Sequence, residues 1–338
     1  MRLTELRTIA NEIISSNGIN ANVEAVKKLS KFYQQITADK NNFDIAADNE
    51  KYVAGGQALS TYHAAVCTDD YLRTCYFIKG VYKAIITLQL DFPNRPIKII
   101  YAGSGPFATL LLPLLPLLSE KAVEAIILDI NSSSVSSVKK LIALLNLNQY
   151  RISVVQTDAT TYQKPEGWEI DLFVTETMHY GLTAEPQVSI TKNFLPQLLP
   201  HTILIPNQIH IDLVYTFFGK EPFIKFNQHP LETTKLQDES SRNHVDRLFS
   251  IDKNATELLN NHQIQTKYYP VPDDLSIYPD LTVFTEINIF EDLTLKTAES
   301  VLTNPYCITS FYHLKAHREF QLIYDYSETP KWAISLRN

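Results

Sequence analysis

The chain has 338 residues, of which 45% are hydrophobic and 20% charged, so it can bury a full core and is long enough for roughly two domains. A net charge of −7 without a Lys/Arg cluster argues against nucleic acid as a main partner. Cys67, Cys75 and Cys307 form no CxxC pair, which indicates buried free thiols and no metal site. No apolar run reaches the roughly 18 residues of a membrane span, so we expect a cytoplasmic protein without a membrane partner.

Apolar residues recur at helical spacing in the first ninety residues. They predict helices over residues 3–14, 23–32 and 70–88. Asp70 stands at the start of the third helix, where a carboxylate suits both capping and the helix dipole. The Pro-containing segment 91–96 then stops the pattern. Residues 1–92 are therefore predicted to form a helical N-terminal cap.

The rhythm of the next hundred residues is strand, loop, helix, strand. The runs 97–103, 124–130, 152–158 and 169–176 are apolar without alternation, as strands covered on both faces are. Helices are expected between them, one ending at Leu118 and one over 134–146. Residues 93–206 are therefore predicted to form an α/β, doubly wound, Rossmann-like core with a parallel sheet.

The last part of the chain alternates apolar and polar residues in short runs. "IHIDLVYTFF", "LTVFTEINIF", "CITSFYHL" and "EFQLIYDYS" predict antiparallel strands separated by turns rich in Pro and Asn. Residues 207–338 are therefore predicted to form a C-terminal antiparallel, β-barrel-like domain. The polar, weakly helical segment 229–267 is predicted to be a surface insertion or arm.

Glycines and acidic residues follow successive strands of the predicted core. Gly103 and Gly105 allow a tight turn and a close approach of a ligand to backbone amides, although Ala108 replaces the third glycine of a dinucleotide motif. Asp129 can accept ribose hydroxyls, or it can cap the next helix. Asp158 can meet an adenine amino group, or it can serve a turn. Because parallel strands share one carboxyl edge, their agreement predicts an adenosine cofactor, bound by Gly103, Ser104, Gly105, Asp129, Ile130, Asp158 and Ala159.

The stretch "VTETMHYGLTAEPQ" places Glu176 and Glu185 nine positions apart with no Asp, Glu, Lys or Arg between them. A guanidinium is planar, always cationic and carries several N–H donors, so two carboxylates can hold it in one orientation. The alternative is that the glutamates are idle, for instance as charges near a helix N-terminus. The pattern thus favours a site for a flat cationic group.

These residues resemble those of the class I S-adenosylmethionine-dependent methyltransferases, and more narrowly the protein arginine methyltransferases. The similarity lies in Glu176, "TMHYGLTA" and Glu185, in "LLPHTILIP", and in Arg73-Thr74 after acidic residues. The resemblance implies S-adenosylmethionine as cofactor, with Arg73 pairing with its carboxylate and Glu176 touching both cofactor and substrate. The family's Thr-His-Trp triplet is missing, and "SFYHLKAH" offers His313 and His317 instead. A homodimer is a possible assembly.

The resemblance also suggests the walls of the substrate site. Tyr62, Met178, Tyr180 and His313 are candidates, although such side chains more often serve packing. His179 is a candidate to relay the proton released on transfer, or it is a hydrogen-bonded bystander.

The function predicted from all this is N-methylation of a guanidino or amine nitrogen, with Glu176, Glu185 and His179 as catalytic residues. We expect the substrate to be a small molecule rather than a protein. The alternatives are O- or C-methylation of a metabolite, methylation of arginine in a protein or peptide, a non-catalytic cofactor-binding protein, and a nicotinamide oxidoreductase.

Overall fold

A parallel sheet with the strand order β5-β4-β3-β6-β7 forms the centre of the fold. The computed structural model describes residues 2–38, 49–233 and 239–338. The strands of this sheet are β3 (Ile97–Ala102), β4 (Val123–Asp129), β5 (Arg151–Gln156), β6 (Leu172–Thr175) and β7 (Ile203–Ile205). Ile99 and Tyr101 of β3 belong to one apolar cluster, and Ile100 and Ala102 to another. Both faces of β3 are therefore buried, which explains its apolar run without alternation, whereas the edge strand β5, predicted to be covered in the same way, has no fully buried residue.

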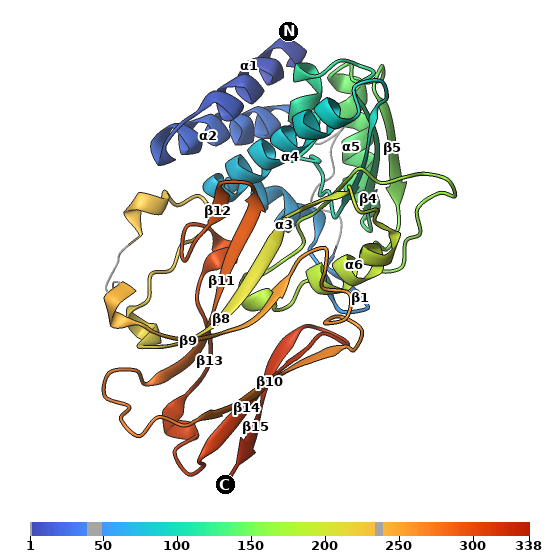
Figure 1. Ribbon diagram of the computed structural model, residues 1–338. Helices are drawn as coiled ribbons and strands as arrows, with labels where there is room; N and C mark the ends of the chain where they lie inside the picture. Colours follow the sequence, from blue (N-terminus) through green and yellow to red (C-terminus); the bar gives the residue numbers. More distant parts are fainter. Residues whose placement is uncertain (1, 39–48, 234–238) are drawn as a thin grey trace.

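Helices cover both faces of this sheet. One face packs against α4 (Tyr71–Asp91) and α5 (Ser132–Leu144), and the other against α6 (Gln187–Phe194). The N-terminal helices α1 (Arg2–Ser15) and α2 (Ile19–Thr37) pack on α4 and lie at the opposite end of the molecule from the C-terminal strands (Figure 1). The predicted helices over 3–14, 23–32, 70–88 and 134–146 correspond to α1, α2, α4 and α5.

The helix predicted to end at Leu118 is wrong. The stretch between β3 and β4 is fully described and holds turns followed by the 3-10 helix η2 (Leu112–Leu117). Pro113 and Pro116 explain this, because each lacks the N–H that an α-helix needs and its ring clashes with the preceding turn. Leu112, Leu114 and Leu115 of η2 are nevertheless buried, and α1 packs against this helix.

The C-terminal part consists of antiparallel sheets. One sheet has the order β12-β11-β8-β9 with β13 also paired to β11, and another has the order β10-β14-β15. The described strands are thus grouped in separate sheets that do not close into one barrel. Their bounds are β8 (Gln208–Thr216), β9 (Asn243–Ile251), β10 (Gln263–Pro270), β11 (Asp280–Phe290), β12 (Leu293–Leu295), β13 (Tyr306–Ser310), β14 (Glu319–Asp325) and β15 (Lys331–Arg337).

The segment 229–267 is not the surface insertion that its polar composition predicts. Residues 234–238 lie outside the described residues, but the remainder includes β9 and the start of β10. Strand β9 pairs with β8 along most of its length, and Phe249 and Ile251 are buried. Because the exposed side of β9 is polar, the composition of the segment did not reveal that it contains a strand of the sheet.

The order in which strands are added to the sheet reverses between β3 and β6. The chain runs from β3 outward through β4 to β5, then crosses back so that β6 pairs with the other side of β3. In open α/β sheets, ligands bind outside the carboxyl ends of the strands at such a switch point. The loops that follow β3 and β6 begin at Gly103 and Glu176, which places the glycine turn and the first glutamate side by side.

Asp171, just before β6, ties the opposite end of the sheet together. Its buried carboxylate accepts two hydrogen bonds from the Arg95 guanidinium at 2.6 and 2.7 Å, one from the Lys98 N–H at 2.8 Å, and contacts His201 Nε2 at 2.9 Å. Burial acts to raise the pKa of Asp171, but these partners outweigh it and hold the pKa below its usual 3.8.

Replacing Asp171 with Ala is expected to lower the free energy of unfolding by about 3–5 kcal/mol, because it strands the Arg95 charge. Urea denaturation measures this, with the exposed Asp273→Ala as control. Since the folded pKa is depressed, the contribution of Asp171 is present above about pH 4 and is lost as the pH falls further. A variant that unfolds like the wild type at pH 7 would contradict this role.

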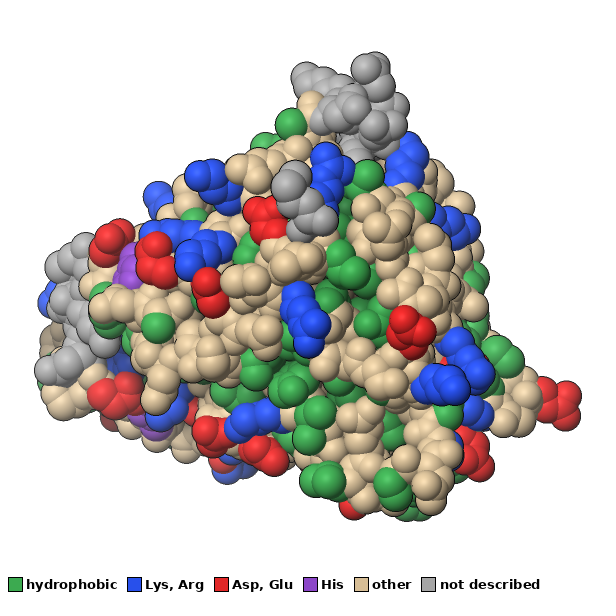
Figure 2. All heavy atoms as spheres, turned by 90° about the horizontal axis from the view of Figure 1, so that it is seen from above, with side chains coloured by type: hydrophobic (Ala, Val, Ile, Leu, Met, Phe, Trp, Pro, Cys, Tyr) green, Lys and Arg blue, Asp and Glu red, His purple; other side chains and the backbone are tan. Residues whose placement is uncertain are grey.

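The surface carries charges of both signs. Figure 2 looks down on the molecule from above the N-terminus, and basic and acidic side chains are interspersed on the described part of this face. Within the described ranges, no helix is both long and apolar enough to cross a bilayer.

Candidate active site

A cavity with an empty volume of about 960 Å³ opens at the carboxyl edge of the parallel sheet. Its walls come from the loops after β3, β4, β5 and β6, from the N-terminus of α4, and from the segment before α4. Such a position is typical of a small-molecule site. The predicted residues that line it are Arg73, Gly103, Ser104, Gly105, Asp129, Ile130, Asp158, Ala159, Glu176 and Glu185.

The glycine turn is built around Asp129. The Asp129 carboxylate accepts hydrogen bonds from the N–H groups of Gly105 and Asn131, both at 2.8 Å. Gly103 and Gly105 have φ values of 72° and 61°, which residues with a Cβ rarely adopt. A Cβ on Gly103 would lie 2.1 Å from Cγ2 of Thr177. The turn therefore keeps the loops after β3 and β6 in direct contact.

Asp158 also lines the cavity, but part of its carboxylate serves its own turn. Oδ1 accepts hydrogen bonds from the N–H and the hydroxyl of Thr160 at 2.8 and 2.7 Å. This is the turn role that the sequence left open. The neighbouring Ala159 is buried and packs beneath the cavity.

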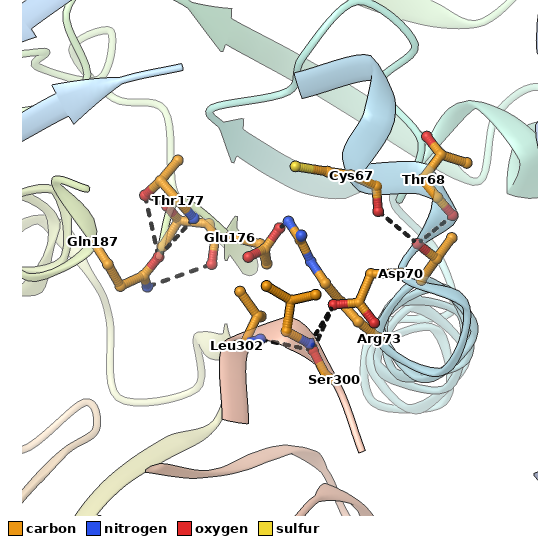
Figure 3. Close-up of polar contacts among 12 residues, drawn as sticks. Cys67, Thr68, Asp70, Arg73, Glu176, Thr177, Gln187, Ser300 and Leu302 are labelled. Carbon is orange, nitrogen blue, oxygen red and sulfur yellow. Dashed lines mark hydrogen bonds and ion pairs between the residues drawn. The ribbon is translucent and has the colours of Figure 1, made fainter. Parts of the chain in front are cut away.

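Arg73, on the first turn of α4, points into the cavity and forms an ion pair with Glu176 (Figure 3). Their side chains are only 10% and 6% exposed. Burial acts to lower the pKa of the Arg73 guanidinium, but the neighbouring Cys67 and Asp70 raise it, and the net direction is upward. Glu176 uses one oxygen, Oε2, in this pair. Its other oxygen, Oε1, is buried and has no hydrogen-bond partner among the described residues.

Glu185 reaches the same cavity from the other end of the loop. It precedes Pro186 and the start of α6, and its carboxylate faces the interior and not the helix. Burial raises the pKa of Glu185 to about 7, while the charge of Arg73 acts to lower it. The two glutamates and one arginine thus share a poorly solvated space.

The loop from 176 to 185 is held by the nearby Gln187 and by residues that lie far away in the sequence. Gln187 accepts from the Thr177 N–H at 2.9 Å, and the Gly181 N–H donates to Thr285 Oγ1 at 3.1 Å. Trp332 Nε1 donates to the Gly181 carbonyl at 2.9 Å, and the Tyr324 hydroxyl donates to the Leu182 carbonyl at 2.7 Å. The C-terminal strands therefore position the glutamate loop, a role that the sequence did not reveal for these residues.

A short hairpin covers the other side of this loop. It consists of β1 (Lys51–Val53) and β2 (Gly56–Ala58), followed by α3 (Thr61–Val66). The Gln57 N–H donates to the Ala184 carbonyl at 2.8 Å, and a Cβ on Gly56 would lie 2.5 Å from the Pro186 nitrogen. Lys51 Nζ donates to the Ile130 carbonyl at 3.0 Å. The prediction of an all-helical N-terminal cap is thus incomplete, because this region also contains the hairpin β1–β2. We call it the lid hairpin, since it covers the loop.

Asp70 has a different partner from the one predicted. It is the N-cap residue of α4, but its buried carboxylate accepts from Ser300 Oγ at 2.7 Å and from the Val301 N–H at 2.9 Å. Ser300 is the N-cap and Val301 the first residue of the 3-10 helix η8 (Val301–Thr303). The bond fixes the helix that carries Arg73 to the C-terminal part of the chain.

The predicted substrate walls do not line this cavity. Met178 is 2% exposed and belongs to the apolar core, and Tyr62 is 57% exposed. The Tyr180 ring packs near Phe223 and Tyr306, with centroids 5.7 and 6.1 Å away. His313 lies on the surface in the 3-10 helix η9 (Phe311–His313).

His179 does not line the cavity, and its ring has a hydrogen-bond partner. Its Nδ1 lies 2.9 Å from Thr183 Oγ1, and burial lowers the pKa of the imidazole.

The cysteines differ in burial. Cys75 is buried, whereas Cys67 and Cys307 are half-buried, and all are free thiols. Cys67 lines the cavity beside Arg73, which its sequence position did not predict. The described part of the chain holds no group of three or more His, Cys, Asp or Glu residues able to bind a metal.

Comparison with solved structures shows which known fold this architecture resembles. The chain superposes on the Trypanosoma brucei PRMT1 enzyme–prozyme heterotetrameric complex with AdoHcy with a TM-score of 0.51 and 13% identity, covering 80% of this chain and 96% of that one. It superposes on Arabidopsis thaliana protein arginine methyltransferase 10 with a TM-score of 0.50 and 11% identity, covering 82% and 97%. The sequence matches no family model and no curated protein. The chain thus has the fold of the protein arginine methyltransferases, which confirms the predicted fold class.

Proposed function

We propose that the protein is an S-adenosylmethionine-dependent N-methyltransferase that acts on a guanidino or amine nitrogen. The observation that carries the proposal is the meeting of Glu176 and Glu185 in the cavity that also contains the glycine turn and Asp129. The unpartnered Oε1 of Glu176 is a buried acceptor that lacks a donor within the described residues, as expected where a cationic ligand binds. The T. brucei neighbour was solved with AdoHcy, which supports the choice of cofactor.

The residues of the cavity fit such a cofactor. The backbone of the turn from Gly103 to Gly105 would pack against the nucleoside, the remaining acceptor sites of the Asp129 carboxylate would take its ribose hydroxyls, and Arg73 would hold an amino-acid carboxylate. When bound, S-adenosylmethionine supplies an electrophilic methyl group on a sulfonium sulfur.

The glutamates then have two tasks. Their charges orient the planar cation so that one nitrogen presents its lone pair to the methyl carbon, and they keep positive charge on the other nitrogens. The nitrogen that receives the methyl group would also have to lose a proton. Glu185, whose pKa is about 7, is suited to accept it near neutral pH.

The surroundings of the cavity favour a small substrate. The hairpin β1–β2 lies against the 184–186 segment on one side, and Trp332, Tyr324 and Thr285 hold the loop on the other. Glu176 is thereby almost fully enclosed. We propose a free guanidino or amine compound as substrate, and comparing transfer to arginine, agmatine and arginine-containing peptides tests this choice.

The rate should depend on the ionisation of Glu185. Below pH 7 its carboxyl is protonated and cannot hold a cation, so kcat/KM is expected to rise about tenfold per pH unit and to level off above about pH 7. The pH profile of kcat/KM from pH 5.5 to 8.5 checks this. In Glu185→Gln the inflection near pH 7 should disappear along with most of the activity. An unchanged inflection in that variant would assign it to another group.

A further inference from the structure

The ion pair between Arg73 and Glu176 presents a conflict inside the proposed active site. Arg73 carries a guanidinium, the same group that the glutamates are proposed to recognise in the substrate. Its Nη2 forms an ion pair with Oε2 of Glu176, and both side chains are at least nine-tenths buried. In this state a substrate cation finds only Oε1 of Glu176 free among the described contacts. Figure 3 shows Arg73 extended from α4 toward Glu176.

The backbone beneath Arg73 is fixed, so a change at this site is confined to the side chain. Asp70, one helical turn earlier, is bonded to Ser300 and Val301. Thr74 Oγ1 donates to the Thr68 carbonyl at 3.2 Å. These bonds hold the first turn of α4 on two sides. The guanidinium, at the end of a long flexible chain, can still rotate within the cavity that it lines.

We propose that Arg73 is an internal guanidinium that blocks Glu176 until the carboxylate of the methyl donor draws it away. The donor would then have to bind before the substrate cation. This inference rests on the proposed function. A buried arginine does not leave one carboxylate without another anion to receive it, and the amino-acid part of S-adenosylmethionine supplies one. Glu176 is then freed for the substrate, so each ligand favours the binding of the other.

The test uses the wild-type protein and measures the binding of the guanidinium ion, at millimolar concentration, by calorimetry. The apoprotein is expected to bind it weakly. Saturating S-adenosylhomocysteine should tighten binding at least about tenfold, within the usual range of coupling between sites. 5′-Methylthioadenosine, the same nucleoside thioether without the amino-acid carboxylate, should give no such gain. Equal gains with both nucleosides, or a gain with neither, would overturn the inference.

A variant tests whether the ion pair between Arg73 and Glu176, here called the latch, causes this coupling, rather than another effect of the nucleoside. Arg73→Met removes the internal guanidinium, so its apoprotein should bind guanidinium at least about tenfold more tightly than the wild-type apoprotein, with nothing added by S-adenosylhomocysteine. Arg151→Met, at a 65% exposed arginine that faces Glu124 at 3.9 Å, is the matched control and should behave like the wild type. An Arg73→Met protein that is folded but binds guanidinium no better than the wild type contradicts the latch.

Failure of the proposed function looks different. If S-adenosylhomocysteine does not bind the wild type, or if guanidinium fails to bind even when the nucleoside is present, the methyltransferase proposal itself is overturned. If both bind but independently, the methyltransferase proposal stands and Arg73 is no latch.

Discussion

Replacing Glu176 with Gln is expected to lower the rate of methyl transfer to a guanidino substrate by about 10²–10³-fold, as the loss of one well-placed electrostatic group in a buried site does. Gln has the same shape and keeps one acceptor oxygen, but it loses the charge and presents an N–H₂ group to a cation that has only donors. The affinity for S-adenosylhomocysteine should not fall, because the glycine turn and Asp129 are untouched and Arg73 no longer has an ion pair with Glu176 to break. Initial rates with labelled methyl donor and calorimetry with the product nucleoside measure the two quantities.

The control for this variant is Glu169→Gln, which removes the same charge from an exposed position shortly before β6. Its rate should match that of the wild type. A Glu176→Gln protein that transfers methyl groups at the wild-type rate would mean that the glutamate loop is incidental, and the chemistry would then be that of an oxygen or carbon acceptor.

Gly103→Ala is expected to abolish cofactor binding. The added Cβ would lie 2.1 Å from Cγ2 of Thr177, so the Thr177 side chain must turn away from its 3.1 Å hydrogen bond to Gln187 Oε1, or the loops after β3 and β6 must separate. Either change disturbs the turn that lines the cofactor end of the cavity and the neighbouring Glu176. We expect affinity for S-adenosylhomocysteine to fall by at least about 100-fold, which corresponds to about 2.7 kcal/mol. Calorimetry measures the loss.

Gly167→Ala provides a matched control. Gly167 has a φ of 70°, almost the same as the 72° of Gly103, but a Cβ at position 167 would meet nothing within 4 Å. Both substitutions force Ala into the left-handed region, at a cost of about 1–2 kcal/mol in stability. The control should therefore lose similar backbone stability yet keep full affinity. Equal affinities in the two variants would show that the contact with Thr177 does not shape the site.

The core of the fold could be predicted because its sequence signals are local. A strand buried on both faces must be apolar throughout, and the runs around Ile99, Ile126 and Phe173 have this property. We could predict that Gly103, Asp129 and Glu176 lie close together, because the carboxyl ends of parallel strands meet at one edge of a sheet. The structure does bring them to the same cavity.

The remaining features depend on contacts between distant parts of the chain. Asp70 looks like a helix cap, but its partner Ser300 is 230 positions away. Trp332 and Thr285 hold Gly181 from two different antiparallel sheets, and no pattern in the sequence links them. Strand β9 is polar because one side of it faces solvent, and the lid hairpin is too short to show a period. The burial of Met178 in the core could not be predicted either, because its neighbours in space are far away in the sequence.

The central claim is that two carboxylates grip a flat cation in front of a sulfonium methyl donor. A crystal structure with S-adenosylhomocysteine and agmatine tests it most directly. We predict that the guanidinium lies between Glu176 and Glu185 with one nitrogen directed at the sulfur, and that Arg73 contacts the carboxylate of the nucleoside. A structure in which the nucleoside is bound, while Glu176 remains paired with Arg73 and the guanidinium lies outside the cavity, would contradict the claim.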